Sequence, residues 1–168
     1  KKLPANFPVP ILCVQHISPG FLSGLVEWLD GQCSLKVVIA KDGQKPEPGH
    51  VYFPEEDTHL EIGPNGTLHS VKTKPSIHGF RPSVTILFES VANHCGRSAV
   101  AVLMTVMGDD GADGLKSIHD QGGLTIAQDE ATSTVFGMPK EAIARGAAEH
   151  VLPLAEIGPE LAEYFGVK

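Results

Sequence analysis

The chain has 168 residues, of which 42% are hydrophobic and 20% charged, and its formal net charge at pH 7 is −7. This length suits one domain with a core of its own, and 18 glycines and 13 prolines are too few for a low-complexity sequence. The acidic balance argues against nucleic-acid binding, which uses basic patches. The longest nearly unbroken apolar stretch, Pro8–Val14, is far shorter than the roughly 20 residues that span a bilayer, so we expect no membrane insertion.

The three cysteines, Cys13, Cys33 and Cys95, are widely spaced and odd in number. Since no Cys-x-x-Cys pair occurs, neither a disulfide framework nor a zinc ribbon is indicated. The cysteines therefore predict a reducing, cytoplasmic location.

The first elements alternate apolar strands with a helix. Pro10–Gln15 is predicted to be a buried strand because its apolar side chains are continuous. Ser18 can cap a following helix and Pro19 suits its first position, while Gly31 can end it. Leu35–Ala40 is a second predicted strand. The apolar positions that define the helix are Phe21, Leu22, Leu25, Val26 and Leu29.

The stretch from about residue 50 to residue 74 has a different pattern. Val51–Phe53 and Leu60–Ile62 are strand-like, and Asn65-Gly66 precedes Leu68–Val71. Asn-Gly between two alternating stretches is a strong hairpin signal. We therefore expect an antiparallel β-hairpin excursion over about residues 50–74.

The remaining sequence returns to alternating helices and strands. Ser83 can cap a helix that ends at Gly96. The next expected elements are a strand at Ala99–Thr105, a helix at Gly111–Asp120, a strand at Leu124–Ala127, a helix at Pro139–Arg145, a strand near Val151 and a helix through Leu161 and Phe165. This order predicts one α/β domain over residues 1–168, with a mostly parallel, doubly wound sheet and helices on both faces.

Polar clusters follow three predicted strands, where ligands bind in open α/β sheets. They are Gln15-His16, Met107–Gly111 and Gln128–Glu130. A histidine base needs a carboxylate that fixes its tautomer, and Asp109 or Asp110 can supply one to His16. Plain helix capping is the alternative interpretation of these residues. No Gly-x-Ser-x-Gly turn is present, so the pattern offers a base and an acid without an evident nucleophile.

The acidic stretch after Gly108 also suggests a weaker alternative, a magnesium-dependent hydrolase that uses Asp109, Asp110 and Asp113. The stretch does not satisfy the calcium-binding EF-hand pattern, because Gly111 stands at its third position. Phosphate-binding glycine motifs are absent from the sequence, and no two histidines have the spacing of a metal site.

Four blocks of sequence together carry a family resemblance. They are Val14–Phe21, Phe80–Val84, Met107–Gly111, and Ala127–Glu130 continuing through Val135–Pro139. In their order and spacing they resemble the catalytic domain of the bacterial chemotaxis receptor methylesterase, a protein-glutamate methylesterase that is also a glutaminase. The resemblance covers essentially the whole chain.

The resemblance implies a serine hydrolase centre without a metal or organic cofactor. His16 is implied to be the base, Asp110 its carboxylate partner, and Met107 the donor of a backbone N–H to the oxyanion. The family's serine lies in a Gly-x-Ser-Thr-Gly-Gly turn, and Lys1–Pro4 matches the end of the helix after that turn. We therefore expect the domain to lack its N-terminal strand and nucleophile here, and this chain alone to be inactive.

The resemblance also implies partners. The substrate would be the cytoplasmic domain of a methylated chemoreceptor, and a regulatory receiver domain would precede the catalytic domain. Two residues depart from the family pattern: Val106 stands where glycine is usual, and Thr85 where aspartate is usual. They favour the alternative function, a catalytically degenerate module on the same fold that binds a receptor or another partner.

Overall fold

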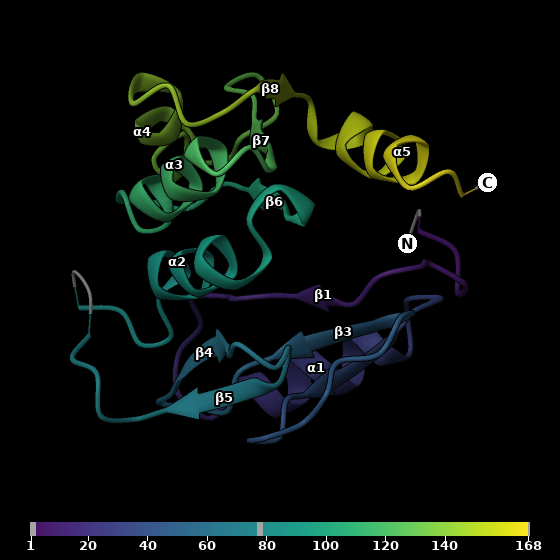
Figure 1. The fold of residues 1–168 in the computed structure, drawn as a ribbon. Coiled ribbons are helices and arrows are strands. Elements are labelled where there is room, and N and C mark those ends of the chain that lie inside the picture. The colour runs from purple at the N-terminus through teal and green to yellow at the C-terminus, as the bar shows by residue number, and fades with distance from the viewer. Residues whose placement is uncertain (1–2, 77–78, 168) are drawn as a thin grey trace. The chain divides into compact units, whose positions relative to one another are not determined.

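The computed structural model describes residues 3–76 and 79–167, so Lys1, Lys2 and His78 lie outside the described residues. The chain divides into two compact units (Figure 1). Unit 1 comprises Lys1–Pro82 and Gly158–Lys168, and unit 2 comprises Ser83–Ile157. Each unit is described by itself.

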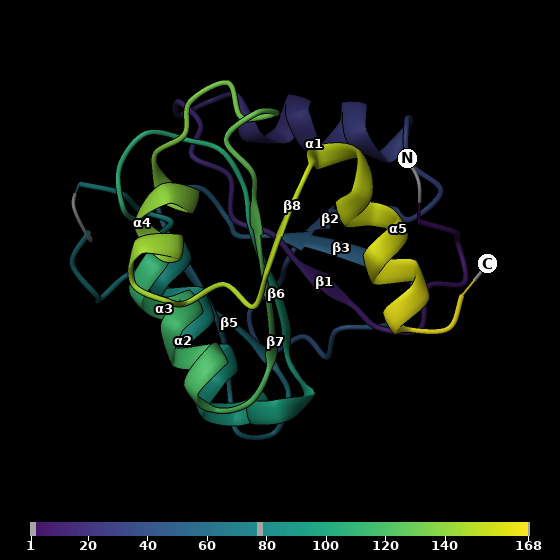
Figure 2. The same cartoon turned by 90° about the horizontal axis from the view of Figure 1, so that it is seen from above.

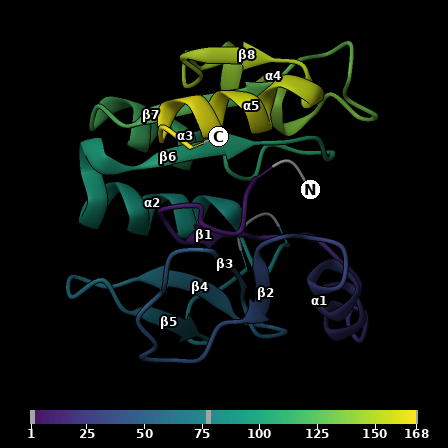
Figure 3. The same cartoon turned by 90° about the vertical axis from the view of Figure 1, so that its right-hand side faces the viewer.

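Unit 1 contains a parallel sheet of three strands in the order β1 (Ile11–Leu12), β3 (His50–Phe53), β2 (Lys36–Ile39). Helix α1 (Leu22–Asp30) lies beside β2 in Figure 2 and Figure 3. The apolar side of α1 and the sheet share a core formed by Leu22, Val26, Val37 and Phe53. Burial of these side chains stabilises the helix more than its propensity does.

The beginning of unit 1 differs from the sequence prediction in two places. The paired part of the first strand is Ile11–Leu12 rather than Pro10–Gln15. Pro10 has no N–H to donate to a ladder, which accounts for the later start, and the Cys13 N–H still donates a 2.9 Å hydrogen bond to the carbonyl oxygen of Tyr52. The capping role predicted for Ser18 was wrong: Phe21 is the N-cap of α1, without a side-chain hydrogen bond. Gly20, at φ 85°, turns the chain between Ser18 and the helix, which moves the hydroxyl away from the cap position. The predicted end of the helix at Gly31 is confirmed.

The antiparallel hairpin consists of β4 (His59–Ile62) and β5 (Leu68–Val71). Gly66 takes the left-handed conformation at φ 70°, as the Asn-Gly signal predicts. The predicted range of about 50–74 was too wide, because His50–Phe53 forms the central parallel strand β3. Tyr52 and Phe53 in β3 are buried, which suits a strand paired on both edges.

Unit 2 contains a second parallel sheet, in the order β6 (Val100–Leu103), β7 (Leu124–Gln128), β8 (His150–Leu152). Every residue of the central strand β7 is buried. Three helices pack side by side next to this sheet in Figure 1 and Figure 2: α2 (Val84–Cys95), α3 (Ala112–Asp120) and α4 (Met138–Ala144). A short 3₁₀ turn (Gly96–Ser98) follows α2. The last helix, α5 (Leu154–Tyr164), begins in unit 2, and its residues from Gly158 on belong to unit 1.

Two local predictions for unit 2 are confirmed. The hydroxyl oxygen of Ser83 accepts a hydrogen bond of 3.4 Å from the backbone N–H of Ile86 at the start of α2, and Gly96 ends that helix.

Helices α2 and α3 approach closely at Gly114, where a Cβ atom would lie 2.6 Å from the Cβ of Phe88. Glycine is therefore required at this crossing.

The predicted α/β fold class is confirmed: the strands are mostly parallel, one pair is antiparallel, and helices alternate with the strands from α2 onward. Among the described residues, every helix is too short or too polar to span a bilayer.

Candidate active site

His16 lies in unit 1, in the loop after β1, and is half-buried. Its imidazole stacks on the ring of Phe80, with ring centroids 4.0 Å apart and planes 2° from parallel. The side-chain amide of Gln15 donates a hydrogen bond of 3.1 Å to the carbonyl oxygen of His16. The stack restricts rotation of the imidazole about its side-chain bonds, as a positioned base requires.

A cavity of about 110 Å³ lies in the same part of unit 1. It is lined by the loops after β1 and β3, including Gln15, Pro54 and Glu56, and by Arg81. The carboxylate of Glu56 accepts a hydrogen bond of 2.9 Å from the backbone N–H of Gly20. This cavity is at the carboxyl ends of parallel strands, where α/β proteins bind ligands.

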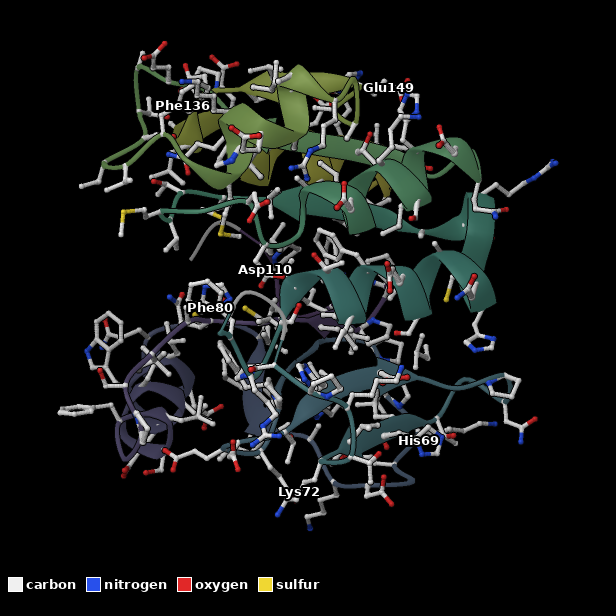
Figure 4. The ribbon with its side chains drawn as sticks, turned by 90° about the vertical axis from the view of Figure 1, so that its left-hand side faces the viewer. His69, Lys72, Phe80, Asp110, Phe136 and Glu149 are labelled. Carbon is white, nitrogen blue, oxygen red and sulfur yellow. The ribbon has the colours of Figure 1, made fainter. Side chains whose placement is uncertain are left out.

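Asp110 lies in unit 2, in the loop between β6 and α3, and its residue surface is 1% exposed. Its carboxylate accepts hydrogen bonds from the Ser83 hydroxyl (2.6 Å) and from the backbone N–H groups of Val84 (2.7 Å) and Thr85 (3.1 Å). Figure 4 shows Asp110 at the beginning of α2. Three donors and the positive end of the helix dipole stabilise the negative charge of this buried carboxylate.

Besides donating its N–H to Asp110, Thr85 makes a second hydrogen bond to the loop between β6 and α3. Its hydroxyl oxygen accepts a hydrogen bond of 2.7 Å from the backbone N–H of Gly111, the N-cap residue of α3. The residue that departs from the family pattern thus fastens the loop that carries Asp110. The sequence predicts the cap at Ser83, whereas the bonds of Ser83 and Thr85 to this loop are evident only in the structure. Hydroxyl residues at a helix start were the available signal.

Met107 lies in the same loop as Asp110, and 74% of its residue surface is exposed. The backbone of the preceding Val106 pairs with Phe136 in an isolated parallel bridge. The carbonyl oxygen of Val106 also accepts a hydrogen bond of 3.0 Å from the N–H of Met138. Within the described residues Asp57 is the sole non-glycine residue with a positive φ, so Val106 is not in the left-handed conformation. Valine at this position therefore carries no left-handed strain.

At Gly137 two of the four sequence blocks that carry the family resemblance lie against each other. A Cβ atom on Gly137 would lie 2.5 Å from the carbonyl oxygen of Val106 and 3.0 Å from the backbone nitrogen of Gly108. The Val135–Pro139 block thus packs backbone to backbone against the Met107–Gly111 block. Any side chain at position 137 would push this loop away.

Arg145, after α4, binds the acidic side chains around Asp110. Its guanidinium lies 3.0 Å from a carboxylate oxygen of Asp113, 3.4 Å from Asp109 and 3.6 Å from Glu141. Asp109 and Asp113 thus share Arg145, whereas Asp110 bonds to the start of α2. The three aspartates proposed as magnesium ligands thus already bind protein donors, two of them Arg145 and one the start of α2, and this arrangement does not favour the magnesium alternative.

A groove of about 430 Å³ borders the Asp110 loop in unit 2. Its lining residues come from that loop, from the segment before α4 and from α4 itself: Gly108, Asp109, Phe136, Gly137, Lys140 and Glu141. Of the loop that carries Met107 and Asp110, Gly108 and Asp109 line the groove.

The third polar cluster has a structural role. The buried side chain of Gln128 accepts a hydrogen bond of 3.3 Å from the N–H of Thr105 and donates one of 2.8 Å to the carbonyl oxygen of Thr132. The carboxylate of Asp129 accepts a 3.0 Å bond from the N–H of Thr132. These bonds hold the loop after β7 in place. They do not cap a helix, because the N-cap of the next helix, α4, is Gly137 without a side-chain hydrogen bond.

Cys13 and Cys95 offer little nucleophilic thiolate. Burial raises the pKa of the Cys13 thiol to about 12, and burial also raises the pKa of Cys95. A thiol with such a pKa is almost fully protonated at pH 7.

Comparison with known proteins extends this picture. A family model described as CheB methylesterase matches residues 1–161. A protein-glutamate methylesterase/protein-glutamine glutaminase of Burkholderia lata is 47% identical over 160 residues, which are 95% of this chain and 48% of that protein. The protein-glutamate methylesterase FrzG of Myxococcus xanthus is 44% identical over 167 residues, which are 99% of this chain and 50% of that protein.

A solved structure is similar as well. The crystal structure of the Thermotoga maritima CheB methylesterase catalytic domain has a TM-score of 0.91 and 39% sequence identity, and the match covers 96% of this chain and 87% of that one. The chain spans about half the length of the curated relatives that it matches. By the family match over residues 1–161 and by these likenesses, the chain belongs to the CheB methylesterase family.

Proposed function

We propose that this chain is the catalytic part of a serine hydrolase that demethylates glutamate methyl esters on bacterial chemoreceptors and deamidates receptor glutamines during chemotaxis adaptation. Family membership supports the reaction class, which is ester hydrolysis. The names of the relatives indicate the two substrate groups, a glutamate methyl ester and a glutamine. The observation that carries the proposal is the buried Asp110 carboxylate, held by three donors within the Met107–Gly111 block. A buried, hydrogen-bonded carboxylate is what a histidine base needs as its partner.

In the proposed reaction a serine hydroxyl adds to the ester carbonyl while His16 takes its proton. This serine is the one that the family resemblance assigns to the Gly-x-Ser-Thr-Gly-Gly turn, outside residues 1–168. The Asp110 carboxylate fixes the tautomer of His16 and stabilises the imidazolium. The backbone N–H of Met107 donates to the oxyanion of the tetrahedral intermediate.

Collapse of the intermediate breaks the bond to the methoxy group, which leaves as methanol with the proton from His16. Water then adds to the acyl-serine as His16 takes a proton again, and hydrolysis frees the glutamate side chain and the serine. For a glutamine, the same steps release ammonia. Protein groups supply all these proton transfers, so the proposal uses no metal or organic cofactor.

The alternative, a module that binds a partner without catalysis, rested on Val106 and Thr85. Val106 is not in the left-handed conformation, and the Thr85 hydroxyl binds the N–H of Gly111. Both departures are therefore accommodated around Asp110, and we favour the enzyme. A preceding receiver domain that restrains the enzyme is part of the proposal, and a cytoplasmic location stays a prediction.

The test is methanol release from methylated receptor by the full-length protein. We expect His16→Ala and Asp110→Asn to lower kcat by at least about 10³-fold, as in other serine hydrolase centres. His94→Ala is the matched control, because His94 is exposed at the end of α2. Equal rates for wild type and His16→Ala would contradict the role of His16. Ammonia release from receptors with glutamine at the same sites tests the deamidation.

A further inference from the structure

The stacked pair of His16 and Phe80 joins residues that are far apart in the sequence. Their ring planes differ by 2° at a centroid separation of 4.0 Å, and Phe80 is half-buried (labelled in Figure 4). A parallel stack at this distance leaves the imidazole little freedom to rotate, since tilting either ring would produce a clash or a gap. The plane of the His16 ring is therefore set by the ring of Phe80.

Phe80 is in turn held by its neighbour Arg81. The guanidinium of Arg81 places both Nε and Nη2 2.7 Å from Oδ1 of Asp57, in the loop after β3. Nη1 of Arg81 donates a 3.4 Å hydrogen bond to the carbonyl oxygen of Lys72, just after β5. Through Arg81, the segment before α2 thus binds two separate loops of unit 1, one after β3 and one after β5. Arginine suits this role because its donors form a rigid fork.

The loop that receives Arg81 is itself ordered by local hydrogen bonds. The hydroxyl and the N–H of Thr58 both donate to the carbonyl oxygen of Glu55, at 2.8 and 3.3 Å. Asp57 adopts the left-handed conformation at φ 56°, which aspartate tolerates better than most residues do. The backbone that carries the Asp57 carboxylate is therefore ordered where Arg81 binds.

We infer that Phe80 is a positioning residue that fixes the ring plane of His16, and that the Arg81–Asp57 ion pair keeps Phe80 in that position. The inference rests on the proposed role of His16 as the base. A base must point its nitrogen at the proton that it removes, and a displacement of 1 Å can lower a rate by about 100-fold. An aliphatic side chain at position 80 would fill the volume but would leave the imidazole free to turn.

The first test is the steady-state kinetics of the full-length protein with methylated receptor. Phe80→Leu should lower kcat by about 10- to 100-fold and leave KM within about twofold, because the ring acts on the base and not on substrate binding. Phe80→Tyr keeps the ring and should retain kcat within about threefold of wild type. Phe165→Leu is the matched control, because it removes the aromatic ring that lies edge-on to Phe7, 5.2 Å away in the same unit.

The second test detects the stack directly and does not depend on activity. An aromatic ring parallel to an imidazole shifts the NMR signals of the imidazole protons upfield. His16→Ala identifies the His16 signals in the full-length protein. We expect the upfield shift in wild type and Phe80→Tyr and its loss in Phe80→Leu. Unchanged His16 signals in Phe80→Leu, or a wild-type kcat in that variant, would overturn the inference.

Arg81 is tested by the same two measurements. Arg81→Ala should weaken the upfield shift and lower kcat, and Arg81→Lys should restore part of both. Lys36→Ala is its matched control, because it breaks the 2.6 Å ion pair with Asp30 elsewhere in unit 1. A raised KM with unchanged kcat in Arg81→Ala would instead show that Arg81 binds substrate, which would overturn its positioning role.

The two proposals can fail separately. A wild-type protein that releases no methanol but shows the upfield shift would contradict the proposed function and leave the stack confirmed. A wild-type protein that is active without the shift would contradict the positioning role of Phe80 alone.

Discussion

The hydroxyl oxygen of Thr85, at the start of α2, accepts a hydrogen bond of 2.7 Å from the backbone N–H of Gly111, at the start of α3. Thr85 also donates its own N–H to Asp110 at 3.1 Å. One residue thus binds both a carboxylate and the backbone beside it. Aspartate is usual at this position in the resembling family, and its carboxylate could accept the same N–H. Thr85 thus holds the loop that carries Asp110 at two points.

Thr85→Val should destabilise unit 2. The variant keeps the shape of the side chain but leaves the buried N–H of Gly111 without this acceptor, which costs about 1–3 kcal/mol. Urea denaturation of the full-length protein measures the free energy of unfolding, and Thr85→Ser, which retains the hydroxyl, is the control. Equal stability of Thr85→Val and wild type would contradict the role of this bond.

Asp110→Asn should destabilise unit 2 as well as reduce activity. The amide has one acceptor oxygen and a donor group, so it cannot accept from Ser83, Val84 and Thr85 together. Loss of a charge-assisted bond costs about 1.5–3 kcal/mol. The matched control is Asp120→Asn on exposed surface, which should leave the urea midpoint almost unchanged. Similar midpoints for the two variants would show that Asp110 does not fasten α2.

Gly137→Ala should disrupt the loop that carries Met107 and Asp110. Its Cβ atom would lie 2.5 Å from the carbonyl oxygen of Val106, and such overpacking costs about 1–3 kcal/mol. We expect a lower melting temperature and a lower kcat. Gly24→Ala in α1 is the control: its Cβ atom meets nothing within 4 Å, and alanine favours a helix by about 1 kcal/mol. A melting temperature for Gly137→Ala at or above that of wild type would contradict the close approach.

His59 should make unit 1 less stable in mild acid. The side chain is buried on β4, and burial lowers the pKa of His59 below its ordinary 6.5, although its hydrogen bond with the carbonyl of Pro75 opposes this shift. Between the lowered folded pKa and 6.5 the unfolded chain binds more protons than the folded chain. Stability is therefore fully present above pH 6.5 and falls as the pH drops toward the folded pKa.

The measurement is the free energy of unfolding across this pH range for wild type and His59→Gln, each in the full-length protein. The variant should lose this part of the pH dependence. His94→Ala, at an exposed histidine, should retain it. If the free energy of unfolding changes with pH in the same way for wild type and His59→Gln, the pH dependence comes from groups other than His59.

The sequence by itself determined the features that depend on neighbouring residues. Asn65-Gly66 indicated the hairpin, Ser83 and Gly96 the two ends of α2, and Gly31 the end of α1, because turns and caps are formed by the few residues within them. The four sequence blocks indicated the family by order and spacing, and the family model confirms it.

Tertiary structure decided what depends on distant residues. The central place of β3 in its sheet follows from pairing with both β1 and β2, which no local pattern of residues 50–53 shows. Gly20 moved Ser18 away from its expected cap. The bonds from Thr85 to Asp110 and Gly111, and the stack of Phe80 on His16, join segments that are separate in the sequence. Periodicity and capping signals extend over only a few residues, whereas these contacts form when whole elements pack together.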